Sequence, residues 1–414
     1  MKKLFTLLLI IMAFSAKADY WTQKADFGGA GVNCPFSFSI GNKGYIGTGS
    51  YNVNSYSNEF WEYDPSTNVW TQKANFGGGV RFGATGFSIG NKGYAGLGYD
   101  GGLYFQDFWE YDPATNIWTQ KANFGGAIRY TAIGFSIGNF GYMGAGANLS
   151  AGFYYFDDLW QYDPTLDVWT QKTSLPAPRG SANSFVIGND AYLVCGWNTS
   201  GVLIDLLEYN SITNSWSQKA NFPSTERGDA AAFSICDKGY YGIGEGPGAS
   251  MFHNDFWEYN PIADSWIQKT NFGGLIRNEA AYFSIGNKGY IGLGAGIIPP
   301  YYNDFWEYTP DSACATAIEE FQISNFDFQI SPNPAHEYAV ISWFPIAIGT
   351  SENKNAELLI TTLEGKKVYE TKLLTSGFRP DSYRVPTSDF PKGIYLVQII
   401  SNQKISATRK LVIE

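Results

Sequence analysis

The chain has 414 residues, of which 44% are hydrophobic, 17% aromatic and only 16% charged, and it contains 47 glycines. This composition favours an all-β protein with many turns over a helical or disordered one. Because the net charge is −10, a polyanionic partner would be repelled, and we expect no nucleic-acid binding.

The first eighteen residues, MKKLFTLLLIIMAFSAKA, have the pattern of a secretory signal peptide. Two lysines precede an apolar run from Leu4 to Phe14, and Ala16 and Ala18 form an A-x-A cleavage pattern. The alternative, a membrane anchor, is disfavoured because this run is too short to span a bilayer, and no other segment is long enough. We therefore predict export, a mature chain beginning at Asp19 and no integral membrane segment.

A phrase of aromatic and acidic residues recurs six times. The copies are EFWEYDPSTNVW (59–70), DFWEYDPATNIW (107–118), DLWQYDPTLDVW (158–169), DLLEYNSITNSW (205–216), DFWEYNPIADSW (255–266) and the shorter DFWEYTPDS (304–312). Such self-similarity indicates a repeat architecture. We interpret the aromatic residues as packing contacts between neighbouring repeats, because a single four-stranded sheet cannot bury both faces alone.

Each repeat predicts four short antiparallel strands, which we name a to d in chain order. In one repeat, TGFSI and YAGLG flank a turn at residues 90–93, and FWEY and WTQK flank a turn at residues 112–116. Glycine and asparagine tolerate positive φ in the first turn, and Asp and Pro begin the second. The d-to-a and b-to-c loops should then share one face, and the short turns the other.

Tryptophans of strand d fall at residues 21, 70, 118, 169, 216 and 266. This period, with glycines ending strand b, resembles the kelch repeat of the galactose oxidase/kelch-like superfamily over residues 19–311, although strand b ends in G-x-G rather than in a glycine doublet. The first strand d precedes any strand a, and the last strand c (305–308) has no strand d after it. We therefore predict an all-β, six-bladed kelch-type β-propeller that is closed by its N-terminal strand.

The C-terminal part reads as a second domain. After a linker at 312–325, seven short strands predict an Ig-like β-sandwich over residues 326–414. The phrases SPNPA (331–335), LEGKKVYE (363–370), FPKGIYLVQI (390–399) and the terminal RKLVI resemble the type A sorting domain of the type IX secretion system of Bacteroidota. The resemblance implies that residues 326–414 engage the type IX machinery and are removed after export to the cell surface or medium. The alternative is a generic Ig-like binding module.

The b-to-c loops vary in length and content, and variable loops on a constant scaffold are where binding is usually found. They are rich in Tyr, Phe, Trp, Asn, Ser and Gly, which suit sugar or protein recognition. The alternative is that these aromatics only pack the loops together. The candidate ligand contacts in the loops are Tyr99, Tyr104, Tyr154, Trp197, Glu245, His253 and Tyr301.

Strand a is the innermost strand, and it begins with an arginine in five of the six repeats. Arg81, Arg129, Arg179, Arg227 and Arg277 could ring the channel mouth, and the alternative is a structural role. Two positions after the arginine, the last two repeats place Asp229 and Glu279. Each carboxyl is expected on the same side of its strand as its arginine. These acids are candidate binding groups and weak candidates for general acid/base catalysis.

Histidine and cysteine limit the possible chemistry. With only His253 and His336 in the chain, a multi-histidine metal site is excluded, and we expect no metal and no cofactor. His253 is expected to be an exposed loop residue. The four cysteines show no C-x-x-C spacing, and the compartment allows a disulfide whose pairing the sequence leaves open.

The sequence thus predicts an exported kelch-type propeller that binds a glycan or a protein at its b-to-c loop face. One alternative is a carbohydrate-active enzyme such as a sugar mutarotase, since some six-bladed kelch proteins have that activity. The other is a structural or adhesive surface protein, which would need only the broad aromatic face.

Overall fold

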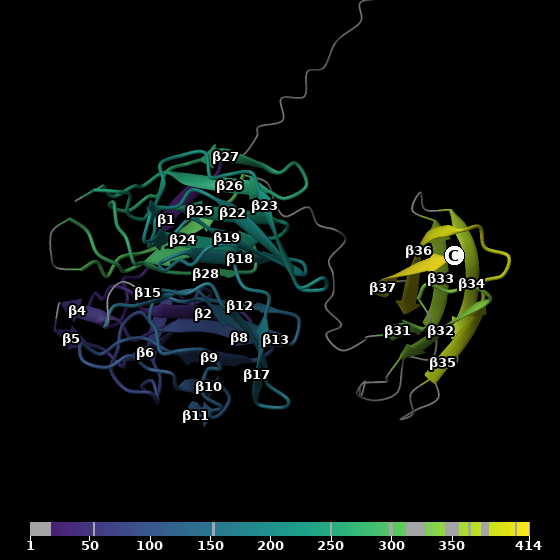
Figure 1. Cartoon of the computed structure of the whole chain (residues 1–414), viewed down its shortest axis with the longest axis horizontal. Coiled ribbons are helices and arrows are strands. Elements are labelled where there is room, and N and C mark those ends of the chain that lie inside the picture. Colours follow the sequence, from purple (N-terminus) through teal and green to yellow (C-terminus); the bar gives the residue numbers. More distant parts are fainter. Residues whose placement is uncertain are drawn as a thin grey trace, which may run out of the picture. The chain divides into compact units, whose positions relative to one another are not determined.

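The computed structural model describes residues 18–52, 54–150, 154–248, 251–297, 301–311, 328–331, 333–343, 356–362, 366–373, 381–401 and 404–413. All regular structure in these residues is β, in strands β1 to β37, and none of it is a helix that could cross a membrane (Figure 1). The chain divides into two compact units, Met1–Ala315 and Thr316–Glu414. The predicted linker lies outside the described residues, as does the predicted signal peptide apart from its last residue.

In the part of unit 1 that the structure describes, six four-stranded antiparallel sheets form, which we number in chain order. Sheet 1 has β2 (Phe36–Ile40), β3 (Lys43–Gly47), β6 (Phe60–Asp64) and β7 (Val69–Gln72), and sheet 2 has β8 (Thr85–Ile89), β9 (Lys92–Gly96), β10 (Phe108–Asp112) and β11 (Ile117–Lys121). Sheet 3 has β12 (Ile133–Ile137), β13 (Phe140–Gly144), β16 (Leu159–Asp163) and β17 (Val168–Lys172), and sheet 4 has β18 (Asn183–Ile187), β19 (Asp190–Val194), β22 (Leu206–Asn210) and β23 (Ser215–Lys219). Sheet 5 has β24 (Ala231–Ile235), β25 (Lys238–Gly242), β26 (Phe256–Asn260) and β27 (Ser265–Lys269), and sheet 6 has β28 (Ala281–Ile285), β29 (Lys288–Gly292), β30 (Phe305–Thr309) and β1 (Tyr20–Gln23).

Sheet 6 joins the two ends of the repeat region. Strand β1 pairs antiparallel with β30, so that Trp21 lies opposite Tyr308 and Gln23 opposite Trp306. In Figure 1 the N-terminal strand accordingly lies among strands of the later sheets. The predicted pairing of the N-terminal strand with residues 305–308 is confirmed, and the edge of β30 is covered.

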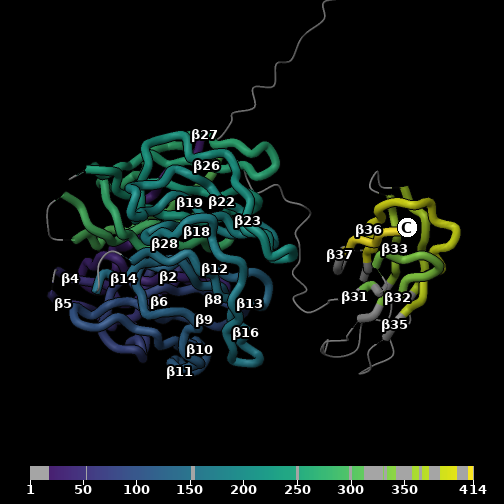
Figure 2. The backbone as a smooth tube through the Cα atoms, viewed as in Figure 1, coloured from purple at the N-terminus to yellow at the C-terminus, as the bar shows by residue number. Residues whose placement is uncertain are grey.

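The six sheets form a closed cycle. Their first strands contact one another in the order β2, β8, β12, β18, β24 and β28, and β28 contacts β2 again, while the tube in Figure 2 passes through the sheets in chain order. A phenylalanine of each first strand lies against the second strand of the next sheet. A Cβ atom at Gly141 would be 2.2 Å from the Phe87 ring, and one at Gly44 would be 2.1 Å from the Phe283 ring. Glycine is therefore needed at these two positions of close approach.

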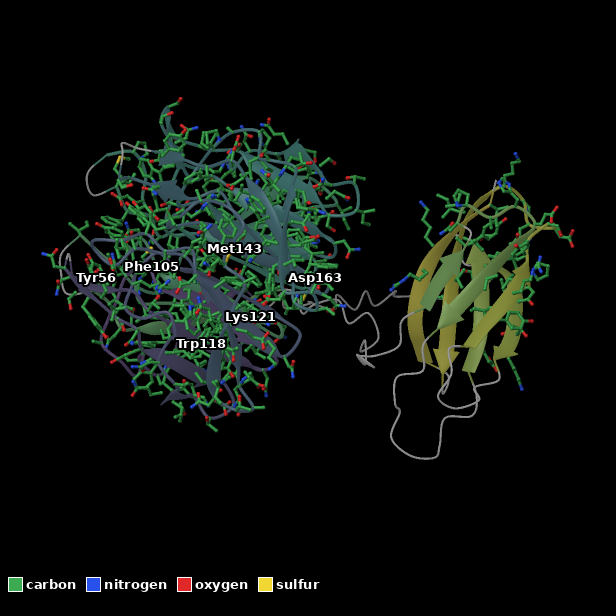
Figure 3. The ribbon with its side chains drawn as sticks, turned by 60° about the horizontal axis from the view of Figure 1, so that its bottom comes forward. Tyr56, Phe105, Trp118, Lys121, Met143 and Asp163 are labelled. Carbon is green, nitrogen blue, oxygen red and sulfur yellow. The ribbon has the colours of Figure 1, made fainter. Side chains whose placement is uncertain are left out.

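The recurring aromatic phrase packs one sheet on the next. The Trp118 ring, labelled in Figure 3, lies 4.9 Å from the Phe60 ring of sheet 1 and 5.1 Å from Tyr111 in its own sheet. The Tyr111 hydroxyl donates a hydrogen bond to Asn116, which ends the turn at a φ of 56°. Both the aromatic residues and the asparagine of the phrase thus serve packing and turn geometry.

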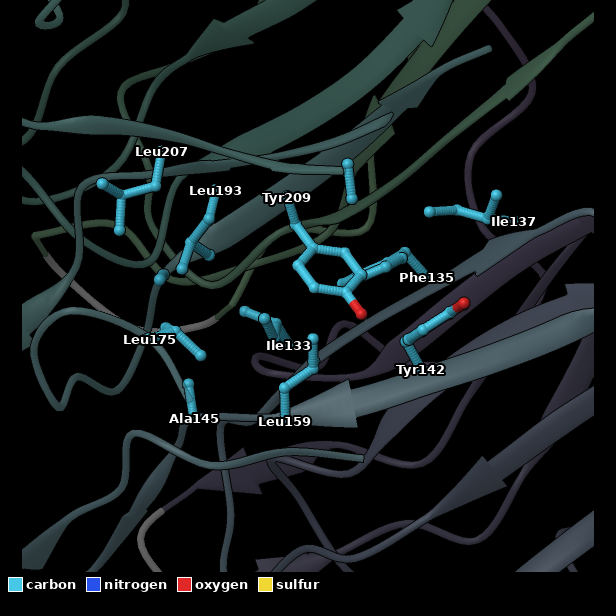
Figure 4. Close-up of a cluster of buried hydrophobic side chains, with 12 residues drawn as sticks. Ile133, Phe135, Ile137, Tyr142, Ala145, Leu159, Leu175, Leu193, Leu207 and Tyr209 are labelled. Carbon is cyan, nitrogen blue, oxygen red and sulfur yellow. The ribbon is translucent and has the colours of Figure 1, made fainter. Parts of the chain in front are cut away.

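Sheets 3 and 4 show how the cores between sheets form. Figure 4 shows Leu193, Leu207 and Tyr209 of sheet 4 in one buried cluster with Ile133, Phe135 and Leu159 of sheet 3. Burial of apolar surface between such faces is the main favourable term in folding.

Short hairpins order some of the loops between second and third strands. They are β4 (Ser50–Asn52) with β5 (Ser55–Tyr56), β14 (Ala147–Asn148) with β15 (Tyr154–Tyr155), and β20 (Trp197–Asn198) with β21 (Gly201–Val202). These are the predicted b-to-c loops of sheets 1, 3 and 4.

The described residues of unit 2 form seven strands in two sheets. One has β31 (Phe328–Ser331), β32 (Tyr338–Trp343) and β35 (Asp381–Pro386), and the other has β34 (Lys367–Leu373), β33 (Ala356–Thr362), β36 (Gly393–Ser401) and β37 (Lys404–Ile413). Ile341 and Val385 from the first sheet share a buried core with Leu358, Val397 and Leu411 from the second. The two sheets therefore pack face to face.

Candidate functional site

The five repeat arginines are buried within their own sheets. Each is at most 1% exposed and forms an ion pair with the aspartate that precedes the third strand. In sheet 6, Arg277 Nη1 donates to Asp304 Oδ1 at 2.6 Å and Nη2 donates to Oδ2 at 2.8 Å. Arg277 Nη1 also donates to the carbonyl oxygen of Leu293 at 2.9 Å. The guanidinium therefore ties three segments of one sheet together.

The same aspartate explains the D-x-W pattern of the recurring phrase. Asp304 Oδ2 accepts a hydrogen bond from Trp306 Nε1 at 2.7 Å. In sheet 1, where Val32 replaces the arginine, Glu59 replaces the aspartate and accepts from Trp61 Nε1 at 3.0 Å. In sheet 5, burial raises the pKa of Asp255, but hydrogen bonds and charge from Arg227 outweigh it and lower this pKa to about 2.

The burial and ion pairs of Arg81, Arg129, Arg179, Arg227 and Arg277 do not support a ring at the channel mouth and favour the structural alternative. Nor do arginine and acid share one side of an extended strand, because Asp229 and Glu279 have φ values of 53° and 51°. A left-handed residue interrupts the alternation of side chains on which that expectation rested.

These left-handed residues form a closed ring of backbone hydrogen bonds, which we call the central ring. Its members, one before the first strand of each sheet, are Cys34, Gly83, Thr131, Ser181, Asp229 and Glu279. Each amide N–H donates to the carbonyl of the ring member in the preceding sheet, at distances of 2.8 to 3.3 Å. The Cys34 amide donates to Glu279, which closes the ring. Since the backbone satisfies itself, the side chains are available for other contacts.

Two adjacent ring members carry carboxyl groups whose pKa values are raised. Burial, together with the charge of Glu245, raises the pKa of Asp229 to about 7 against hydrogen bonds from Ser181 and Trp197. Burial and the charges of Asp229 and Glu245 raise the pKa of Glu279 to about 8 against a hydrogen bond from Asn33. Asp229, Glu245 and Glu279, which come from two sheets, thus interact electrostatically beside the central ring.

A cavity of about 220 Å³ lies beside these acids. Sheets 3 to 5 and their loops contribute its lining, which consists of Tyr130, Thr131, Ala147, Leu149, Tyr155, Ser181, Trp197, Asp229 and Glu245. Three of these residues, Thr131, Ser181 and Asp229, are members of the central ring. Aromatic faces, hydroxyls and carboxyls therefore converge on one small space.

Residues 329–414 match the family model of the secretion system C-terminal sorting domain. The sorting domain that the sequence predicted is thereby confirmed, and it supports export to the cell surface or the extracellular space. No curated protein matches the chain. A solved structure titled "Structure of YjhT" is similar, with a TM-score of 0.59 and 17% identity, and the match covers 68% of this chain and 95% of that one. At this identity the likeness establishes the fold alone, a β-propeller.

The predicted loop candidates divide into residues near the acids and residues that lie outside the cavity lining. Trp197 and Glu245 line the cavity. Tyr301 lies near Glu279, whose charge, together with burial, raises the Tyr301 pKa. Tyr99 packs on Tyr104 with ring centroids 4.5 Å apart.

Tyr104 and Tyr154 lie outside the lining. The Tyr104 hydroxyl accepts a hydrogen bond from the Leu149 amide at 3.1 Å, so this residue holds loops together. Tyr154 is 66% exposed.

His253 is half-buried rather than exposed. Its Nε2 atom is buried and has no hydrogen-bond partner among the described residues. Burial, with a smaller effect from the charge of Arg227, lowers its pKa. The neighbouring Gly246 explains the close packing, because a Cβ atom there would lie 2.9 Å from His253 Nε2.

Sequence reasoning missed several residues of the lining. Tyr130 and Tyr155 provide aromatic faces, and Thr131 and Ser181 provide hydroxyls. A signal for Tyr130 was present, since the residue after the arginine is a tyrosine in this repeat alone. Tyr155 lies in the most aromatic of the variable loops and could not be told from Tyr154 without the hairpin geometry.

The cysteines and possible metal ligands complete the description. Cys34 and Cys195 are free thiols, and Cys236 is disulfide-bonded, while Cys314 lies outside the described residues. Burial and the charges of Glu279 and Asp229 raise the Cys34 pKa. No group of three or more His, Cys, Asp and Glu side chains in the described part of the chain is arranged to hold a metal ion.

Proposed function

We propose that the chain is an exported binding protein whose propeller holds one sugar unit of a glycan in the cavity beside the central ring. In this proposal residues 19–311 form a six-bladed kelch-type propeller closed by β1, and residues 326–414 form an Ig-like sorting domain. The observation that carries the proposal is the convergence of Tyr130, Tyr155 and Trp197 with the carboxyls of Asp229 and Glu245 on one cavity.

Sugar recognition fits this lining for two reasons. Aromatic side chains offer apolar faces for the C–H surface of a sugar ring, and carboxyls and hydroxyls bond its hydroxyl groups. The volume of about 220 Å³ is below the roughly 300–1,000 Å³ of pockets for drug-sized ligands. It therefore suits one monosaccharide unit better than a protein segment, which would use a broader surface.

The test is glycan-array binding by residues 19–414, with Trp197→Ala and Asp229→Asn as cavity variants. Tyr154→Ala is the matched control, because Tyr154 is an exposed loop aromatic outside the lining. Selective binding that both cavity variants lose and the control keeps would support the proposal. Binding that only the control loses would move the site to the loop rim, and binding to no glycan would refute a sugar site.

A second candidate function is general acid/base catalysis on a bound sugar, such as mutarotation. Its support is the pair of carboxyls with pKa values raised to about 7 and about 8, which lets one group accept a proton while the other donates one near neutral pH. Ring opening would move the proton of the anomeric hydroxyl to the base and a proton from the acid to the ring oxygen, and closure would reverse both transfers. Polarimetry on freshly dissolved hexoses, with Glu279→Gln beside the parent chain, tests this activity.

Export through the type IX machinery is the last part of the proposal. We expect the signal peptide at 1–18 to be removed in the periplasm and the sorting domain to be removed at the cell surface. Deleting residues 329–414 should leave the propeller in the periplasm. If the truncated chain still reached the surface, the sorting role would be refuted.

A further inference from the structure

The acids at the cavity differ from the repeated acids of unit 1 in how their charge is balanced. Five aspartates face buried arginines. Five glutamates lie 3.5 to 3.7 Å from a lysine, and these are Glu62, Glu110, Glu208, Glu258 and Glu307. Within the described residues, Asp229, Glu245 and Glu279 take part in none of the ion pairs. The cavity lining contains no Lys, Arg or His.

The neighbouring amides leave unused acceptors as well. Asn278 Nδ2 donates to Glu245 Oε2 at 2.7 Å, and Asn33 Nδ2 donates to Glu279 Oε2. In both amides the Oδ1 atom is buried without a hydrogen-bond partner in the described part of the chain. Asn278 is only 7% exposed, so its Oδ1 atom has lost most of its access to solvent. Buried acceptors without donors are unfavourable, and these two amides contact the acids although neither belongs to the cavity lining.

We propose that the sugar bound in this cavity is an amino sugar, whose ammonium group lies against the carboxyls of Asp229 and Glu245. This inference rests on the proposed sugar site and names its ligand class. An ammonium supplies three donors and the missing positive charge, whereas the hydroxyl of a neutral hexose supplies donors only. The carboxylate of an acidic sugar would add a further negative charge to three acids and is excluded.

The raised pKa values agree with this assignment. Burial and mutual repulsion of the acids raise the pKa of Asp229 and of Glu279. A bound cation would favour the ionised carboxyls and offset that cost.

The experiment compares four sugars on the chain without its predicted signal peptide, residues 19–414, by isothermal titration at pH 7. The probes are glucosamine, N-acetylglucosamine, glucose and glucuronate. The acetylated sugar is the matched control, because it keeps the nitrogen and removes its charge. We expect glucosamine to bind about tenfold or more tightly than the two neutral sugars, from the greater strength of charge-assisted hydrogen bonds, and glucuronate not to bind.

Two conservative variants test the residues. Glu245→Gln and Asp229→Asn should each remove the preference for glucosamine and leave weak binding of glucose. Asp157→Asn is the control, since it removes one exposed loop carboxyl outside the lining. Because the variants could unfold, tryptophan fluorescence checks each one, and Glu245 lies outside the central ring and provides the safer variant.

Each outcome is decisive. Equal binding of glucosamine and glucose, or tighter binding of glucuronate, would overturn the inference and leave the sugar site standing. Loss of the preference in Asp157→Asn alone would also overturn it. If none of the four sugars nor any arrayed glycan binds, the proposed sugar site itself fails.

Discussion

Replacing Arg129 by methionine should destabilise unit 1 and leave ligand binding by the folded protein unchanged. Arg129 Nη2 donates to Asp158 Oδ2 at 2.8 Å, Nη1 to the Ala145 carbonyl at 2.8 Å, and Nε to the Ala127 carbonyl at 2.9 Å. Methionine fills much of the space but leaves Asp158 and two carbonyls without this donor. Breaking a buried ion pair by removing one partner costs about 3–5 kcal/mol. With an unfolding entropy of about 2.1 cal/mol/K per residue over roughly 290 residues, that loss lowers Tm by about 5–8 °C.

Arg179 offers a matched comparison within the same protein. The Arg129 guanidinium lies 3.9 Å from the Phe156 ring centroid and 5.0 Å from that of Phe124. Phe105 stacks on Arg81 in the same way and is labelled in Figure 3. At Arg179 the equivalent backbone positions hold Leu175 and Leu203. Arg179→Met should therefore cost less than Arg129→Met by about 0.5–2 kcal/mol, the size of a cation–π contact.

The assay is urea unfolding at 25 °C followed by tryptophan fluorescence. Twelve of the 13 tryptophans lie in unit 1, so the signal reports this unit. A loss below about 1 kcal/mol for Arg129→Met would refute the reasoning from buried ion pairs. If Arg129→Met were as stable as the parent chain but no longer bound ligand, Arg129 would instead be a ligand contact at the channel.

Three further predictions follow from the packing and the charges. The folded state keeps protons on Asp229 and Glu279 that the unfolded chain releases near pH 4. Tm should therefore fall as pH rises from about 4 toward the folded pKa values of about 7 and about 8. If the double variant Asp229→Asn with Glu279→Gln shows the same slope of Tm against pH over pH 4–9, other groups cause the fall in Tm. Gly141→Ala should lower the free energy of unfolding by about 1–3 kcal/mol through overpacking, and an unchanged urea midpoint would contradict the close contact with the neighbouring phenylalanine. Cys236 should resist alkylation until a reductant is added, because it is disulfide-bonded; a labelled Cys236 in the unreduced, unfolded chain would be the contrary result.

The repeat made most of the fold of unit 1 predictable. Alternating residues, turn glycines and the spacing of the tryptophans are local signals, and they located the four strands of each sheet to within a few residues. Counting strands also predicted the pairing of β1 with β30, because an unpaired edge at residues 305–308 needs a partner.

The candidate site was predictable only in part. Asp229 stood out as a departure from the repeat, Glu245 and Trp197 were candidates in the variable loops, and the structure brings these three together. The role of the arginines could not be predicted from the sequence. The alternation of side chains along a strand does not reveal an ion pair between residues 26 positions apart, such as Arg81 with Asp107. The positive φ of Asp229 and Glu279 was equally hidden, since residues other than glycine seldom adopt it and no turn glycine marks the position in those two repeats.

The central ring has a consequence for how such a protein changes over evolutionary time. The backbone N–H and C=O groups of its six residues form hydrogen bonds with one another. These residues range from glycine through threonine to glutamate, and the hydrogen-bond pattern is the same at each of them. One amino-acid exchange per sheet therefore changes the side chains around the central ring while its backbone hydrogen bonds stay the same. Because the six positions are equivalent, a new specificity needs exchanges at only a few of them.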